Sequence, residues 1–165
     1  MSAARLASAM LVFAGFALYG KVRGARLQSE ADEVSALASD LSEFEGMIAN
    51  ARLRLPAIAK RLSEKSLTGE FWQGFASGLE RGLSPASAYE EAESKLACSE
   101  AKPALEELFA SLGSSDAESE LKRLGFARLR LEALSAEARK KAEESKKLKG
   151  SLSALLGLAA ALLLL

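Results

Sequence analysis

Few side chains in this sequence are of a type that does chemistry. There is no histidine, a single cysteine at Cys98, and one short acidic run that holds Glu90, Glu91 and Glu93. A cysteine nucleophile is normally activated by a neighbouring base such as histidine, and an acid–base carboxylate needs a second group beside the substrate. The sequence offers neither in a recognisable pattern. We therefore expect Cys98 to fill space in a core and the three glutamates to be solvated surface.

Metal and nucleotide sites are not indicated either. A metal site draws several Cys, His or carboxylate ligands together at a regular spacing, and no such grouping occurs in the sequence. The phosphate-binding pattern G-x-x-x-x-G-K-[ST] does not occur. One cysteine cannot form an internal disulfide, so nothing in the sequence requires an oxidising compartment. The sequence predicts a protein that is not an enzyme, with no catalytic residues, no metal and no cofactor.

Charge is unevenly distributed along the chain, although 22 Lys and Arg balance 22 Asp and Glu. The stretch from Leu27 to Ala138 holds 12 Lys and Arg against 20 Asp and Glu, a balance of −8, and basic residues collect on both sides of it. Because phosphate binding requires a cationic face, this acidic middle argues against nucleic acid as a partner.

Both ends of the chain carry an uncharged apolar run. Leu6–Gly20 and Ser151–Leu165 are each 15 residues long, which is about 22 Å of helix. A bilayer core is about 30 Å thick, and flanking Lys and Arg extend such runs by reaching toward the lipid head groups. The matched lengths predict two transmembrane helices, at residues 5–22 and 149–165.

Two other interpretations of these runs stay open. The first run also fits the apolar part of a cleaved signal peptide, although no A-x-A-like site closes it and basic residues follow at once. The second also fits a buried helix of a soluble protein. Under the transmembrane interpretation, nine Lys and Arg flank the spans on the inner side against Arg5 alone outside. The positive-inside rule then keeps residues 21–150 in the cytoplasm and sends both termini across the membrane.

The middle of the chain, residues 23–148, has the pattern of a helical bundle. Apolar residues recur at steps of three, four and seven, which places them on one face of a helix that continues from the first span: Val34, Leu37, Leu41, Phe44 and Ile48. Pro56 is expected to end this helix, because a proline disfavours α geometry at the residue before it. A short helix with Ile58 and Leu62 follows.

Aromatic residues mark the next helix. Phe71, Phe75 and Leu79 share one helical face and are expected to be core. Trp72 lies off that face, so we identify it as the candidate for an aromatic side chain that contacts a partner protein. Burial of Trp72 in the bundle is the alternative.

Helix ends are indicated by their usual residues. Gly82 and Gly113 are expected stops, Ser84-Pro85 and Pro103 expected starts, and Ser115 to Glu118 an expected capping box. Beyond that point, leucines on one face predict a long helix that continues into the second span: Leu121, Leu124, Leu131 and Leu134. The fold class predicted is an all-α membrane protein, with a small helical bundle as a head between an N-terminal and a C-terminal transmembrane helix.

This layout resembles the stage III sporulation protein AB family over the full chain. Leu112–Asp116 matches a family L-G-x-x-D, and Leu156-Gly157 precedes a leucine tail as in the family. Phe71–Ala88 is similar to the platform domain of type II secretion systems, with the arrangement F-x₃-[FL]-A-x₂-L-x₂-G-x-[SP]. Phe109 and Glu120 depart from the family pattern, which has Gly and Gln there.

The resemblance implies a platform in a secretion-like complex between mother cell and forespore. The protein would lie in the outer forespore membrane with its head in the mother-cell cytoplasm. Its partners would be a secretion-type ATPase, other membrane proteins of the sporulation complex, the lipid bilayer and further copies of the chain. The alternative is a generic membrane scaffold, an oligomerising helical hairpin unrelated to sporulation.

Overall fold

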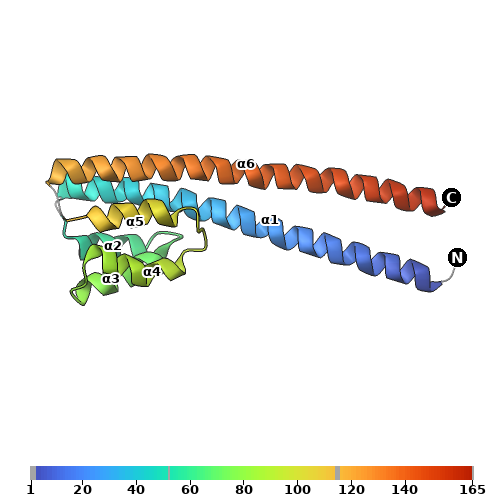
Figure 1. The fold of residues 1–165 in the computed structure, drawn as a ribbon, viewed down its shortest axis with the longest axis horizontal. Helices are drawn as coiled ribbons and strands as arrows, with labels where there is room; N and C mark the ends of the chain where they lie inside the picture. Colours follow the sequence, from blue (N-terminus) through green and yellow to red (C-terminus); the bar gives the residue numbers. More distant parts are fainter. Residues whose placement is uncertain (1–2, 52, 114–115, 165) are drawn as a thin grey trace. The chain divides into compact units, whose positions relative to one another are not determined.

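The described part of the chain is helical. The structure, a computed structural model, describes the backbone of residues 3–51, 53–113 and 116–164 and the side chains of residues 25–49, 53–113, 116 and 118–148. Its elements are α1 (Ala3–Gly46), a π-helical segment (Met47–Ala51), α2 (Leu55–Ser63), α3 (Gly69–Glu80), α4 (Pro85–Ala92), a 3₁₀ turn (Glu93–Lys95), α5 (Lys102–Ser111) and α6 (Ala117–Leu164) (Figure 1). No strand occurs among these residues, so the all-α prediction is confirmed.

The chain divides into two compact units. One holds Met1–Ser29 with Ala138–Leu165, and the other holds Glu30–Glu137. In the first unit the Lys146 ammonium donates a hydrogen bond to Gln28 Oε1 at 3.4 Å, which links the two segments. We call the second unit, residues 30–137, the core unit.

Both predicted membrane spans belong to the first unit. The side chains of residues 5–22 and 149–165 lie outside the described residues. Among the residues that the structure describes, no helix is long and apolar enough to cross a membrane. The predicted division into spans at 5–22 and 149–165 and a head at 23–148 stays a prediction.

The stripe on α1 builds one wall of the core unit, as predicted. Val34, Leu37, Leu41 and Phe44 are 0–1% exposed, and Ile48 packs against them while partly buried. α1 runs for 44 residues without a break, as expected for a helix that continues from the first apolar run.

The start of α2 differs from the prediction. Leu55 was expected outside helical geometry because Pro56 follows it, yet it is the first residue of α2. A proline in the first turn is tolerated because an amide donor there has no helical acceptor to bond.

Helices α3, α4 and α5 of the core unit lie on one side of α1 and α6 (Figure 1), and an aromatic cluster joins the three helices. Phe75 and Phe109 have ring centroids 4.6 Å apart, Tyr89 and Phe109 5.4 Å, and Phe71 and Tyr89 6.1 Å. All four side chains are 0–1% exposed. The prediction that Phe71 and Phe75 are core is confirmed, and Leu79 packs against the same cluster while partly buried.

Small residues let α3 approach α4 closely. A Cβ built on Gly78 would lie 2.9 Å from Ala88 Cβ and 3.1 Å from Ala88 Cα. One turn earlier, a Cβ on Gly74 would lie 3.4 Å from Ala92 Cβ, at the edge of ordinary contact. Only Gly fits at position 78 without a shift of one helix.

The predicted helix ends are largely confirmed. Gly82 and Gly113 have φ of +86° and +85°, a conformation that glycine adopts without strain. The Ser84 hydroxyl accepts the Ser87 amide as the N-cap of α4.

The predicted capping box from Ser115 to Glu118 is only partly within the described residues. Asp116 carries the cap, because its carboxylate accepts hydrogen bonds from the Ser119 amide and hydroxyl. These bonds hold the pKa of Asp116 below its ordinary value. Ser115 lies outside the described residues. The Glu120 carboxylate accepts the Gly113 amide at 2.7 Å, so it ties the turn to the helix.

The predicted leucine face of α6 is half right. Leu124 and Leu131 are fully buried, whereas Leu121 is intermediate and Leu134 packs at the edge of the core. Helix α6 runs for 48 residues through Gly125, as expected for a long helix that continues into the second apolar run.

The close α3–α4 contact predicts a contrast between two glycines. Gly78→Ala should lower the free energy of unfolding by about 1–3 kcal/mol, because the methyl group forces the helices apart. Gly74→Ala is the matched control. It should be neutral or stabilise by up to about 1 kcal/mol, because alanine favours helix. Denaturant titration of both variants measures the difference, and equal effects at the two positions would contradict the packing.

Candidate functional site

A buried carboxylate ties α1 to the loop before α3. Asp40 is 7% exposed, and its Oδ2 atom accepts three hydrogen bonds. They come from the Trp72 indole N–H at 2.7 Å, the Thr68 hydroxyl at 2.6 Å and the Ser66 hydroxyl at 2.6 Å. The Ser66 hydroxyl also accepts the Thr68 amide at 3.1 Å. We call these four residues the Asp40 cluster.

The prediction that Trp72 faces a partner protein is wrong. Its side chain is 0% exposed, and its ring lies 5.0 Å from Phe71 and 5.9 Å from Phe44. Helix α3 is buried on two faces. Phe71 and Phe75 face α4 and α5, and Trp72 faces α1. The sequence argument assumed one buried face, as for a helix at the surface of a bundle.

Glu90, Glu91 and Cys98 are of types that could do chemistry, and the structure places them as follows. Glu90 and Glu91 are exposed, and Glu91 pairs with the Arg81 guanidinium. Cys98 is a buried free thiol at 6% exposure, and its backbone amide donates to Glu33 Oε2 at 2.7 Å. Among the residues that the structure describes, no three Cys, His, Asp or Glu side chains are grouped to hold a metal ion.

The carboxylates of Glu93, in the 3₁₀ turn, and Glu106, on α5, both act on the buried Tyr89. The phenol donates a hydrogen bond to the Lys102 carbonyl at 2.9 Å. Burial, with the nearby charges of Glu93 and Glu106, raises the pKa of Tyr89 well above its ordinary value. Both carboxylates therefore lie close to one phenol. With the exposed Glu90 on α4, they define what we call the acidic face.

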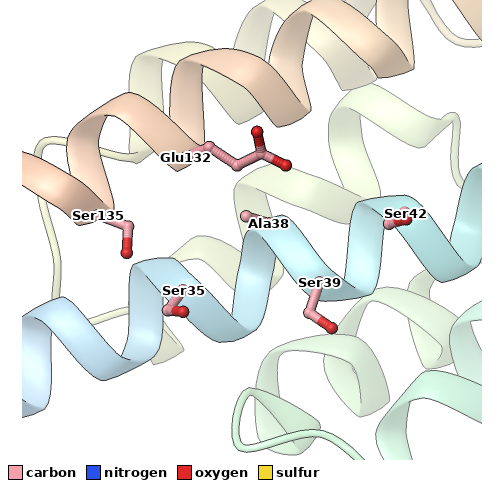
Figure 2. A pocket seen from close by; sticks show the side chains of 6 residues that line it. All are labelled: Ser35, Ala38, Ser39, Ser42, Glu132 and Ser135. Atoms are coloured by element: carbon pink, nitrogen blue, oxygen red, sulfur yellow. The ribbon is translucent and has the colours of Figure 1, made fainter.

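A small polar pocket lies between α1 and α6. It has a volume of about 340 Å³ and is lined by Ser35, Ala38, Ser39, Ser42, Glu132 and Ser135 (Figure 2). Ser135 is 7% exposed. Beside this pocket Arg128 donates to Glu132 at 2.7 Å and lies 3.7 Å from Glu45, and its Nε atom is buried without a hydrogen-bond partner. The polar groups that line this pocket are therefore serine hydroxyls and the carboxylate of Glu132, which is paired with Arg128.

Sequence reasoning missed the Asp40 cluster. Asp40 directly precedes Leu41 of the apolar stripe, so it lies near the core-facing side of the helix. A carboxylate at such a position indicates a buried group that needs hydrogen-bond donors. Its donors stand 26 to 32 residues further along the chain, and no periodicity relates residues at that separation.

Comparison with known proteins points to one family. The family model described as stage III sporulation protein AB matches residues 5–165 of the chain. A solved structure of a stage III sporulation protein AB is similar in fold, with a TM-score of 0.63 and 19% sequence identity over 70% of this chain and 97% of that chain. At this identity the similarity supports the fold alone. A search of curated proteins found no match.

The Asp40 cluster predicts a large and local loss of stability. Asp40→Ala removes the acceptor of three buried or half-buried donors. The free energy of unfolding should fall by about 3 kcal/mol or more, because each hydrogen bond to a charged group contributes about 1.5–3 kcal/mol. Trp72 is the only tryptophan, so its fluorescence during denaturant titration reports on this cluster.

Glu43→Ala is the matched control on the same helix. Glu43 is exposed and lies 3.8 Å from Arg61, and an exposed ion pair of this kind contributes less than about 1 kcal/mol. Equal losses for Asp40→Ala and Glu43→Ala would mean that the Asp40 cluster is not what stabilises the unit.

Proposed function

Because the chain belongs to the stage III sporulation protein AB family, we propose that it is a platform protein without enzymatic activity in a secretion-like sporulation complex. It holds a cytoplasmic ATPase next to membrane components of that complex. The observation that carries this proposal is the family match, which spans residues 5–165. The involvement in sporulation follows from the family, and the platform role is the step that we add.

The described residues support a role in binding rather than catalysis. Three polar side chains of the core unit that are buried or partly buried have structural tasks. Asp40 orders α3, Tyr89 bonds the start of α5, and Glu33 accepts the amides of Ala97 and Cys98. What the unit offers to other molecules is its surface, which carries a balance of −8 across residues 30–137.

The acidic face is the proposed contact for the ATPase. Glu90, Glu93 and Glu106 project from neighbouring elements, and Glu90 and Glu106 are exposed. A negative surface attracts a basic patch on a partner over distances that salt shortens.

We also propose that the chain lies in the outer forespore membrane, with residues 23–148 in the mother-cell cytoplasm. The two apolar runs at 5–22 and 149–165 and the nine Lys and Arg beside them support this orientation. The runner-up is the generic membrane scaffold, an oligomerising helical hairpin with no ATPase partner.

The orientation predicts which positions react with an impermeant maleimide in intact cells. Ser2→Cys should be labelled, and Ser77→Cys, at an exposed position on α3, should not until the cells are opened. The parent chain is the blank, because its only thiol is buried. Labelling of Ser77→Cys without labelling of Ser2→Cys would reverse the orientation.

The ATPase contact predicts binding that weakens with salt. Binding of the secretion-type ATPase from the same organism, measured by calorimetry, should fall as salt rises from 0.1 to 1 M, which shortens the screening length from about 10 Å to about 3 Å. Glu90→Lys with Glu106→Lys should weaken binding further at the lower salt.

Glu64→Lys is the control, because Glu64 is an exposed carboxylate at the end of α2, outside the acidic face. Equal weakening by Glu64→Lys would remove the acidic face as the contact. No binding at either salt concentration, with Trp72 fluorescence showing a folded chain, would favour the generic scaffold.

A further inference from the structure

The outer side of α6 carries two large apolar residues that are exposed in the described part of the chain. Phe126 is 72% exposed and Leu129 is 54% exposed. They lie about half a helical turn from the buried Leu124 and Leu131, so they point away from the core. Ala133 and Ala136 continue the same exposed line. We call Phe126 and Leu129 the ridge.

The outer side of α1 has the opposite character. Ser35, Ser39, Ser42 and Gly46 follow one another at steps of four, three and four, which keeps them on one face. Ser39 and Ser42 are exposed, and a Cβ built on Gly46 would meet nothing within 4 Å. Figure 2 shows the three serines along α1, next to Glu132 and Ser135 of α6. We call these four residues the trough.

The ridge and the trough lie at matching heights on the core unit. Arg128 lies opposite Glu45, and Ser135 and Ala38 line the same pocket. With α1 and α6 antiparallel, this register places Phe126 level with Met47, next to Gly46, and Leu129 level with Phe44, between Ser42 and Gly46.

We propose that this face joins two copies of the chain in a parallel two-fold pair. In this pair the ridge of each copy fills the trough of the other. A two-fold interface must be complementary to itself. This face meets that condition because the large side chains of the ridge and the small side chains of the trough lie next to each other at the same level along the helices. A dimer in which only the two α6 helices contact each other would instead place Phe126 against Phe126. The bulky rings would then keep Ala133 and Ala136 of the two copies from touching.

Charge complementarity supports a second copy as the occupant. Arg130 flanks the ridge on the α5 side, and Glu43 flanks the trough on the α2 side, at the same height. In the two-fold pair each Arg130 faces the Glu43 of the other copy, which forms two ion pairs. Within one copy, Arg130 lies 3.4 Å from Glu107 and Glu43 lies 3.8 Å from Arg61. Both are exposed ion pairs that contribute little to stability, so either residue can pair with the other copy instead.

The size of the face predicts reversible association. Three to four turns of two adjacent helices cover about 20 Å by 20 Å, or about 400 Å² per copy. Stable interfaces bury about 800 Å² per partner. The pair therefore forms where the chain is concentrated, and this inference does not depend on the ATPase contact.

Crosslinking between two tagged copies of the full chain tests the arrangement. Cells co-express a Leu129→Cys copy and a Ser42→Cys copy and are treated with a short permeant bis-maleimide. We expect a mixed dimer at several times the yield obtained when Ser42→Cys is replaced by Ser77→Cys, an exposed position on α3. The parent chain, with its buried Cys98, is the blank. Each copy carries one new thiol, so a link within a copy does not interfere.

Three outcomes would overturn the proposal. The first is the absence of a mixed dimer, which is expected when a different protein covers the ridge. The second is a crosslinking yield with Ser77→Cys that equals the yield with Ser42→Cys. The third is a higher yield of crosslinks between two Leu129→Cys copies than between Leu129→Cys and Ser42→Cys.

Exchanging the charges of Arg130 and Glu43 separates a lost ion pair from a structural defect, because only a lost ion pair is restored by the double variant. Arg130→Glu or Glu43→Arg alone should lower the mixed-dimer yield about fivefold, as expected for the loss of two exposed ion pairs. The double variant should restore it. Failure of the double variant to restore the yield, with unchanged Trp72 fluorescence, contradicts the pairing of Arg130 with Glu43.

Discussion

One carboxylate in an apolar setting constrains the arrangement of the core unit. A buried charge is costly unless hydrogen bonds replace the water that it loses. Asp40 receives those bonds from Ser66, Thr68 and Trp72, so the loop before α3 and the first turn of α3 must lie against α1. The position of Trp72 then brings Phe71 and Phe75 toward α4 and α5, and the aromatic cluster forms around them. The direction of α3 thus follows from one acceptor.

Several buried or half-buried polar groups hold this architecture together. Asp40, Glu33 and the Tyr89 hydroxyl bond to distant segments, and Cys98 is buried. The remaining charge lies at the surface. The acidic face lies on α4, the 3₁₀ turn and α5, and the ridge and trough lie on α6 and α1. The two proposals therefore assign the partner protein and the second copy to different surfaces of the core unit.

Local signals predicted much of the fold. The stripe on α1, the turns at Gly82 and Gly113 and the Ser84 cap each depend on residues within a few positions of one another, and short-range geometry is what a periodic pattern encodes. The miss at Leu55 is a shift of a helix end. Several residues in a row can cap or start a helix, and the choice among them depends on the packing of the whole segment.

The sequence by itself determined that the described part of the chain is helical, which residues form the apolar faces and where the charge collects. Only the tertiary structure decided which helices have a second buried face. Trp72 became core because α3 lies between α1 and the α4–α5 pair, and Phe126 remained exposed because no element of the core unit covers the outer side of α6. A hydrophobic pattern records that a face is apolar. What covers that face depends on contacts between residues far apart in the chain, whose pairing no local spacing specifies.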